Sequence, residues 1–170
     1  MIESSPYRGP VTVETLKRIC LFDGFDDSTL EFLVSTLKTR ITEPGEYVFR
    51  EGERSGSVYV VLDGELEVLK RSRGGVETRL ALLSVNDWFG EMSIIDSQPN
   101  SASLRALADS RLLVLSEADR EALAKVDNSV HPKLVFNIAK ELCRRLRVAD
   151  GVLADMIDPP ESWPKRFLRN

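Results

Sequence analysis

The 170-residue chain is poor in the side chains that build metal centres and hydrolytic active sites. It has one histidine, His131, and two cysteines, Cys20 and Cys143, which stand far apart with no second histidine or cysteine beside them. A structural zinc site needs four such ligands close together, and a Ser-His-Asp triad needs a histidine beside its partners. We therefore expect no catalytic residues, no metal site and no required cofactor. The two thiols fit buried groups in a reducing compartment.

Long hydrophobic runs and an excess of positive charge are also missing. The longest apolar run, Val58–Leu62, is far too short to cross a membrane, and the first ten residues contain no apolar signal region. With 27 acidic and 23 basic residues the net charge is -4, so no overall positive field attracts nucleic acid. These absences predict a cytoplasmic protein with no membrane span and no DNA binding through bulk charge.

Hydrophobic periodicity divides the chain into a helical beginning, a β-rich middle and a helical end. Helical spacing from Thr12 and again from Ser28 predicts two entry helices, the second with Ser28 and Glu31 as a capping box. Between residues 40 and 115 the period changes to two, and turn residues recur at short intervals. At Ser116 the pattern returns to helix, with a long final helix from about Pro132.

The β-rich middle contains about eight short strands. Asp63-Gly64 lies between the runs Val58–Leu62 and Leu66–Lys70 and is a two-residue hairpin signal. The pattern predicts an α+β fold that is mainly β: an eight-stranded double-sheet jelly roll with N-terminal helices and a long C-terminal helix. We expect four parts, namely a flexible arm at 1–12, the jelly-roll domain with its helical entry at 13–127, a hinge and long helix at 128–157, and a tail at 158–170.

The final helix carries a heptad seam, because seven apolar residues are spaced alternately by four and three. They are Val135, Ala139, Leu142, Leu146, Ala149, Leu153 and Met156. Such a seam packs either on the barrel or on a second copy of the helix. At 1.5 Å per residue, a helix of more than about 20 residues reaches beyond a small barrel, so we expect a homodimer through this helix.

The stretch from Trp88 to Ala106 has the composition of an anion cradle. Gly90 and Glu91 precede a short apolar segment, and small residues at 101–103 follow it. Small residues let the backbone approach a ligand, and a glycine-led turn into a short helix directs N–H groups toward one point. This segment is therefore the predicted phosphate site.

The order of these features resembles the cyclic nucleotide-binding domain of protein kinase A regulatory subunits, gated channels and the bacterial catabolite activator protein. The resemblance covers about residues 13 to 150. It rests on a helical entry, a jelly roll with Gly45, Gly52 and Gly64 at its turns, the Phe89–Glu91 segment, and a long helix that follows. It implies a non-enzymatic regulatory domain whose ligand is cyclic AMP, cyclic GMP or a cyclic dinucleotide.

In that family the segment is the phosphate-binding cassette. The resemblance implies that Glu91 accepts a hydrogen bond from the ribose 2′-hydroxyl and that backbone N–H groups around Met92 and Ser93 hold the cyclic phosphate. The family has an arginine nine residues after the glutamate, where this chain has Asn100. A neutral amide lacks the charged, planar fork of arginine. A hydrogen bond to a charged group is worth roughly 1.5 to 3 kcal/mol, so we expect binding weakened about ten- to a hundredfold.

The predicted ligand-binding residues include one that could supply the missing charge. The set is Phe89, Gly90, Glu91, Met92, Ser93, Asn100, Ser101, Ala102, Ser103 and Arg105. Arg105 could replace the lost arginine or be a surface residue of a strand. Glu91 could equally be a first-turn carboxylate favoured by the helix dipole.

Two functions remain open from the sequence. The first is a sensor that binds a cyclic nucleotide and signals through the C-terminal helix. The alternative is a fold that no longer binds nucleotide and acts as a dimeric module with a possible protein partner. The bacterial relatives carry a helix-turn-helix after the long helix, and residues 152–170 are too few for one, so we expect no direct DNA binding.

Overall fold

The computed structural model describes residues 9–157 and confirms the predicted jelly roll with N-terminal helices and a long C-terminal helix. In chain order the elements are α1 (Val13–Lys17), η1 (Cys20–Phe22), α2 (Asp27–Thr36), β1 (Lys38–Thr42), β2 (Tyr47–Phe49), β3 (Val58–Asp63), β4 (Leu66–Arg71), β5 (Glu77–Leu83), β6 (Trp88–Phe89), α3 (Met92–Ile95), β7 (Ser103–Ala106), β8 (Ser110–Leu115), α4 (Glu117–Val126) and α5 (Val130–Ile157).

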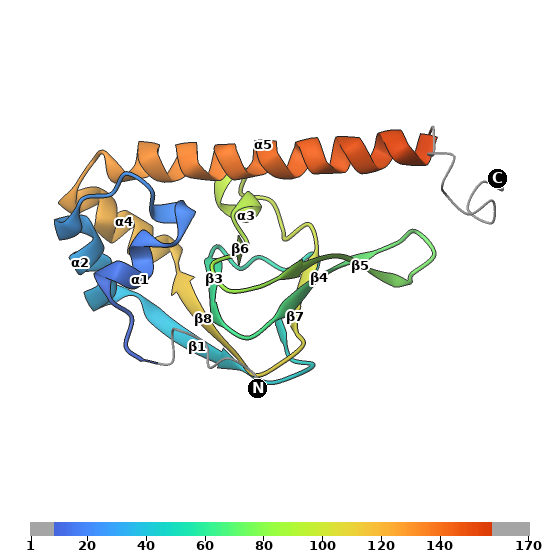
Figure 1. Cartoon of the computed structure of the whole chain (residues 1–170), viewed down its shortest axis with the longest axis horizontal. Helices are drawn as coiled ribbons and strands as arrows, with labels where there is room; N and C mark the ends of the chain where they lie inside the picture. Colours follow the sequence, from blue (N-terminus) through green and yellow to red (C-terminus); the bar gives the residue numbers. More distant parts are fainter. Residues whose placement is uncertain (1–8, 158–170) are drawn as a thin grey trace.

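The strands form two four-stranded antiparallel sheets, in the orders β1-β8-β3-β6 and β2-β7-β4-β5. Figure 1 shows α1, α2 and α4 gathered at one end of the molecule, while α5 runs along one side from these helices to a position over β4 and β5. The cassette element α3 lies between the strands and α5. This arrangement places the long helix over the predicted site.

The continuous apolar run Val58–Leu62 is explained by the position of β3, which is buried on both faces. Val58, Val60 and Leu62 pack in one core cluster with the entry helices, α4 and α5. Tyr59 and Val61 pack in a second cluster between the two sheets. A strand covered on both sides needs apolar residues at every position rather than at alternate ones.

The predicted Asp63-Gly64 hairpin is wrong, because β3 and β4 lie in different sheets. The turn instead carries the chain from one sheet to the other, close to the turn between β7 and β8. Gly64 has φ +91°, and a Cβ there would lie 2.6 Å from the Asp109 carbonyl oxygen. Glycine is required by this approach as well as by the backbone angle, so a corner between sheets produced the same signal as a hairpin.

The helix caps agree only in part with the sequence prediction. Ser116 and Asp119 form the expected reciprocal capping box at the start of α4. At α2 the cap is Asp26, whose carboxylate accepts from the Thr29 backbone N–H at 2.8 Å, and not Ser28. The expectation of buried thiols is also wrong, because both cysteines are free and exposed.

The first half of α5 is fixed to the body through a different face from the predicted seam. Val130, Leu134 and Ile138 are buried against the entry helices. The Asn137 amide donates to the carbonyl oxygens of Leu21 and Asp23 at 3.0 and 2.9 Å, which anchors the helix to η1.

The predicted seam divides between the two halves of α5. Val135 and Leu142 are half-buried, whereas the other five seam residues are exposed, namely Ala139, Leu146, Ala149, Leu153 and Met156. The five exposed seam residues are therefore not buried against the barrel, although Ala149, Leu153 and Met156 line the cleft that α5 forms with β5. Whether it packs on a second copy stays a prediction.

The predicted tail and residues 1–8 of the predicted arm lie outside the described residues. Of the helices in the described part of the chain, none is long and apolar enough to cross a membrane. Within the same part, no three histidine, cysteine, aspartate or glutamate residues come together as a metal site would require.

Candidate functional site

The predicted cassette begins with a backbone turn that only glycine fits. After β6, Gly90 adopts φ +98°, and a Cβ at this position would lie 2.4 Å from the Ser57 carbonyl oxygen. The chain then turns at Glu91 into the single helical turn of α3, where Met92 and Ser93 stand at the start. Gly90 thus brings the cassette backbone against β3 and directs the following residue inward.

Glu91 is buried in the cassette and faces α5. Its side chain is only 1% exposed, and its Oε1 accepts a hydrogen bond from Arg145 Nη1 at 3.0 Å. Burial raises the pKa of Glu91 above the ordinary value, while the Arg145 charge opposes the rise. Among the residues that the structure describes, none donates a hydrogen bond to Glu91 Oε2.

Asn100, at the position of the family's arginine, is also buried. Its backbone is held on both sides, because its N–H donates to the Glu53 carbonyl oxygen and its carbonyl oxygen accepts from Gly52 N–H. Its Oδ1 accepts from the Ser55 hydroxyl at 3.2 Å. Its Nδ2 has no acceptor within residues 9–157.

These two side chains line the same hollow in the protein surface. Phe89, Gly90, Met92 and Ser101 complete its walls. A buried polar atom without a hydrogen bond costs roughly 1 to 3 kcal/mol, and here one acceptor and one donor share one small space. The hollow therefore presents one unpaired acceptor and one unpaired donor to a hydrogen-bonding group, and its volume of about 10 Å³ is close to that of a single water molecule.

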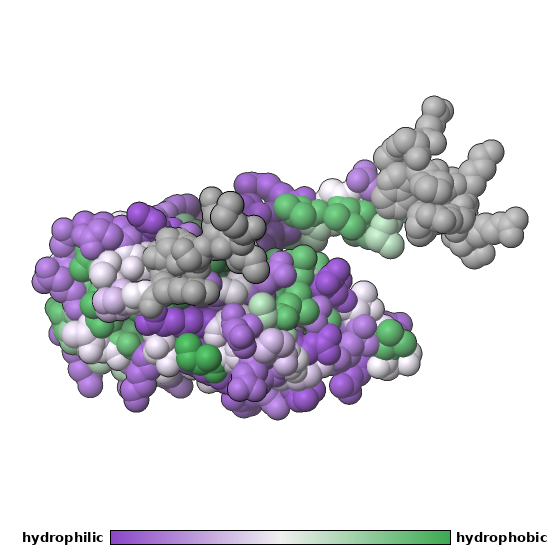
Figure 2. All heavy atoms as spheres, turned by 60° about the horizontal axis from the view of Figure 1, so that its bottom comes forward, coloured by the Kyte–Doolittle hydropathy of each residue, from purple (hydrophilic) through white to green (hydrophobic). Residues whose placement is uncertain are grey.

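Phe89 also lines a larger cleft between the strands and α5. The cleft has a volume of about 660 Å³, and its apolar walls come from β5 and from the second half of α5, including Leu80, Leu82, Val148 and Val152. Figure 2 shows hydrophobic side chains on the second half of α5 and a further hydrophobic group on the body opposite to it. A volume of this size is typical of small-molecule sites.

The remaining predicted residues lie on or beside β7, and only part of them faces the hollow. Ala102 is buried in the core between the sheets, and the Ser103 hydroxyl accepts from Glu51 N–H at 2.9 Å. Arg105 forms a salt bridge with Glu67 at 2.6 Å and also donates to the Tyr47 hydroxyl at 3.3 Å. The geometry thus commits the Arg105 charge to Glu67 on the neighbouring strand.

Three basic residues that contact the cassette were missed by the sequence reasoning, among them Arg54, which donates to the Ser97 carbonyl oxygen at 3.0 Å. Arg145 of α5 donates to Glu91 and to the Trp88 carbonyl oxygen, the latter at 2.6 Å. Lys70 of β4 donates to the Ser101 carbonyl oxygen at 2.5 Å. A signal existed for Arg145, because it continues the inner-face spacing of Leu134, Ile138 and Glu141. Nothing local distinguishes Lys70 from other strand lysines.

The comparison with known proteins agrees with this geometry. The family model of the cyclic nucleotide-binding domain matches residues 39–127. The cyclic AMP receptor protein of Thermus thermophilus is 35% identical over 130 residues, which cover 76% of this chain and 58% of that protein. A CRP-like cAMP-activated global transcriptional regulator of Mycobacterium tuberculosis is 30% identical over 158 residues, covering 92% of this chain and 69% of the regulator.

Solved structures show the same fold. The catabolite activator protein of Thermus thermophilus matches with a TM-score of 0.68 and 34% identity, over 79% of this chain and 62% of that one. A cyclic nucleotide-binding domain from Methylobacillus flagellatus matches with a TM-score of 0.74 and 25% identity, over 84% and 81% of the two chains.

The chain belongs to the cyclic nucleotide-binding domain family, as the residues of its cassette predicted. The two relatives described above are, by name, a cyclic AMP receptor protein and a cAMP-activated transcriptional regulator. The chain spans less than two thirds of the length of the Thermus relative.

Proposed function

We propose that this chain is a non-enzymatic sensor domain that binds a cyclic nucleotide in the cassette and transmits binding through α5. The observation that carries the proposal is the pair of buried atoms, Glu91 Oε2 and Asn100 Nδ2, that face one hollow without partners among the described residues. The names of two relatives, a cyclic AMP receptor protein and a cAMP-activated regulator, support this class of ligand.

The proposed pose assigns each part of the nucleotide to one part of the site. The ribose 2′-hydroxyl donates to the Glu91 carboxylate, and the cyclic phosphate accepts from Asn100 Nδ2 and from the backbone N–H groups that begin α3. The base enters the apolar cleft past Phe89, because that residue lines both spaces. Cyclic AMP, cyclic GMP and a cyclic dinucleotide all share the ribose and phosphate groups that this pose uses.

Transmission follows from the contact between Glu91 and α5. A ribose hydroxyl that reaches the carboxylate competes with or reorders the Arg145 hydrogen bonds, which join the cassette to the long helix. A ligand shifts the position of α5 only by its difference in affinity for the two arrangements. In this proposal residues 13–127 form the binding domain, and residues 128–157 form the hinge and the signalling helix. The protein acts as a cytoplasmic homodimer.

The alternative function is a dimeric protein-interaction module that no longer binds nucleotide. Two observations favour it: the neutral Asn100 at the phosphate position, and the exposed apolar residues on the second half of α5. A possible protein partner would then take the place of the ligand as the input to the module.

Calorimetric titration of the full chain with cyclic AMP and cyclic GMP tests the two functions. We expect measurable binding by the wild type, and binding about ten- to a hundredfold tighter in Asn100→Arg, because the charged fork is restored. Ser35→Arg, which adds the same charge on the exposed side of α2, is the matched control and leaves affinity unchanged. A silent wild type with a binding Asn100→Arg variant supports the interaction module instead.

A further inference from the structure

One cation already touches the closing segment of the cassette although the family's arginine is absent. Lys70 Nζ donates to the Ser101 carbonyl oxygen at 2.5 Å and lies 2.6 Å from Glu51 Oε1. Ser101 directly follows Asn100 and lines the hollow with it. The ammonium group of Lys70 therefore lies at the end of the cassette where a phosphate charge would need a partner.

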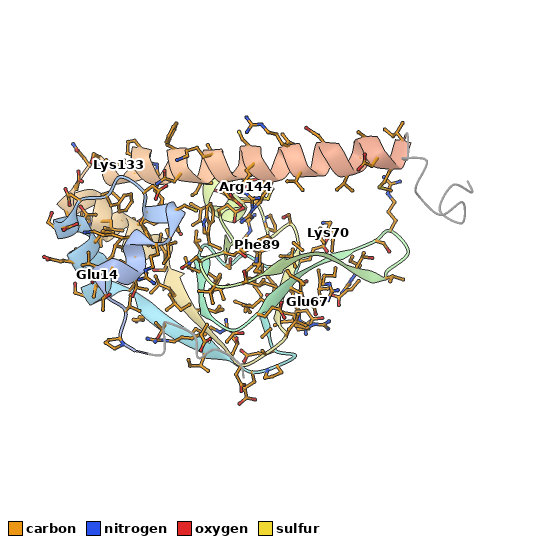
Figure 3. All side chains as sticks on the ribbon, viewed as in Figure 1. Glu14, Glu67, Lys70, Phe89, Lys133 and Arg144 are labelled. Atoms are coloured by element: carbon orange, nitrogen blue, oxygen red, sulfur yellow. The ribbon has the colours of Figure 1, made fainter. Side chains whose placement is uncertain are left out.

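The alternation of β4 directs Lys70 toward the ligand side of the sheet. Leu66 and Val68 face the core between the sheets, and Val68 also lines the apolar cleft. Side chains two apart on a strand share a face, so Lys70 continues this side beyond Val68. Figure 3 shows Lys70 on the side of β4 that faces α5, with Glu67 on the opposite side.

Two other basic side chains at the cassette are held by carboxylates, and a third, Arg54, donates to the Ser97 carbonyl oxygen and lines a different pocket. Arg105 is paired with Glu67 on the opposite side of the sheet, and Arg145 is held by Glu91, Glu141 and the Trp88 carbonyl oxygen. Lys70 is held by two hydrogen bonds, which leave one of the three donors of its ammonium group for an incoming anion. Its side chain is 44% exposed, so the group can turn toward an incoming anion.

We propose that Lys70 supplies the positive charge for the cyclic phosphate that Asn100 cannot supply. This inference rests on the proposed function, that is, on a cyclic nucleotide in the cassette with its ribose at Glu91. Asn100 then provides a short neutral donor, and Lys70 provides the charge from the neighbouring strand. Glu51 neutralises the ammonium group before the ligand arrives and competes with the phosphate for it, and its carboxylate is fixed by the Arg71 backbone N–H at 2.9 Å.

Calorimetric titration with cyclic AMP and with adenosine isolates this charge, because adenosine carries the same base and ribose without the phosphate. We expect Lys70→Met to weaken cyclic AMP binding about tenfold and to leave adenosine binding unchanged. Lys70→Arg keeps the charge and retains affinity. The matched control is Arg71→Met, which removes one positive charge at the next position, where the side chain is 64% exposed and lies 3.9 Å from Glu77.

A second variant tests the same charge without removing the lysine. Glu51→Gln removes the carboxylate that competes for Lys70 but keeps an acceptor for the Arg71 N–H, so we expect tighter binding of cyclic AMP and unchanged binding of adenosine. Thermal unfolding of every variant checks that the fold is retained.

Two results with Lys70→Met overturn the inference, provided that the wild type binds cyclic AMP. In the first, the variant binds cyclic AMP and adenosine as tightly as the wild type does. In the second, its affinity for cyclic AMP and its affinity for adenosine fall by the same factor. A wild type that binds adenosine at least as tightly as cyclic AMP also overturns it, and identifies a neutral nucleoside as the ligand. A wild type that binds neither cyclic AMP, cyclic GMP nor a cyclic dinucleotide overturns the proposed function itself.

Discussion

Arg145 and Glu91 lie 3.0 Å apart, and this pair is the direct link between the long helix and the cassette. The same guanidinium donates to the Trp88 carbonyl oxygen and to Glu141, and it lies over the Trp88 ring at 5.3 Å. One arginine thus satisfies a buried carboxylate, a strand carbonyl and a helix neighbour. Its replacement should affect both stability and ligand response.

Replacing Arg145 with glutamine should destabilise the free protein by about 2 kcal/mol, because Glu91 would remain buried without a counter-charge. Urea unfolding measures the loss. The matched control is Arg144→Gln, since Arg144 is 63% exposed and bonds only to Glu141 among the described residues. We expect that change to stay within about 0.5 kcal/mol. Equal losses in the two variants would contradict a special role for Arg145.

The affinity for cyclic AMP should rise with pH above the ordinary glutamate pKa of 4.5. Burial raises the pKa of Glu91, so part of the free protein carries a protonated Glu91 above that pH. A ribose hydroxyl that donates to the carboxylate favours the ionised form, so binding releases protons and tightens until Glu91 is ionised in the free protein.

The same shift has the opposite sign for stability. A raised folded-state pKa means that the free protein loses stability as the pH rises from 4.5 through the raised value.

Titrations with cyclic AMP from about pH 5 to about pH 8 measure the effect of pH on binding. Glu91→Gln should bind more weakly and with a flat pH profile. Because its hydrogen bonds to Arg144 and Arg145 lower the pKa of Glu141, that group stays ionised in this range. A pH dependence retained in Glu91→Gln would contradict the assignment.

Gly90→Ala should destabilise the protein by more than about 2 kcal/mol, because it adds a clash with the Ser57 carbonyl oxygen to an unfavourable φ. Gly45→Ala is the matched control: its φ is +84°, but a Cβ there meets nothing within 4 Å. The free energy of unfolding of the control should fall by only about 1 to 2 kcal/mol, which is the cost of a positive φ for alanine. Thermal unfolding compares the two, and equal losses would show that the close approach of Gly90 is not needed.

The fold was largely predictable because its signals are local. The run Val58–Leu62 marks a strand buried on both faces, and the return to helix at Ser116 is marked by a real capping box. The Asp63-Gly64 turn misled for a physical reason. A tight turn and a corner between two sheets both require glycine, and only the pairing of β3 with β8 and of β4 with β5 separates them.

The cassette was found from its small residues, but its charges were not. Arg105 has the right spacing on β7, yet Glu67 stands opposite it in the register and takes its charge. Lys70 and Arg145 reach the cassette from elements distant in the sequence, β4 and α5. Side-chain pairing over such distances in the sequence leaves no local pattern for Lys70 and only the helical spacing of α5 for Arg145, which is why the sequence did not indicate these two contacts.

The exposed half of the α5 seam can be charged without disturbing the core. A charge at Leu142 would disturb the core, because this residue packs against the entry helices, whereas Leu146 and Leu153 are 60% and 56% exposed. Leu146→Asp with Leu153→Asp should therefore leave the domain folded and halve the mass measured by light scattering, since two carboxylates would face the same apolar seam of a second copy. Cys143→Asp with Ala154→Asp introduces the same two charges at exposed positions of α5 outside the seam and should remain dimeric. A wild type that is monomeric at high concentration would contradict the predicted dimer. Signalling through α5 would then have to act within one chain.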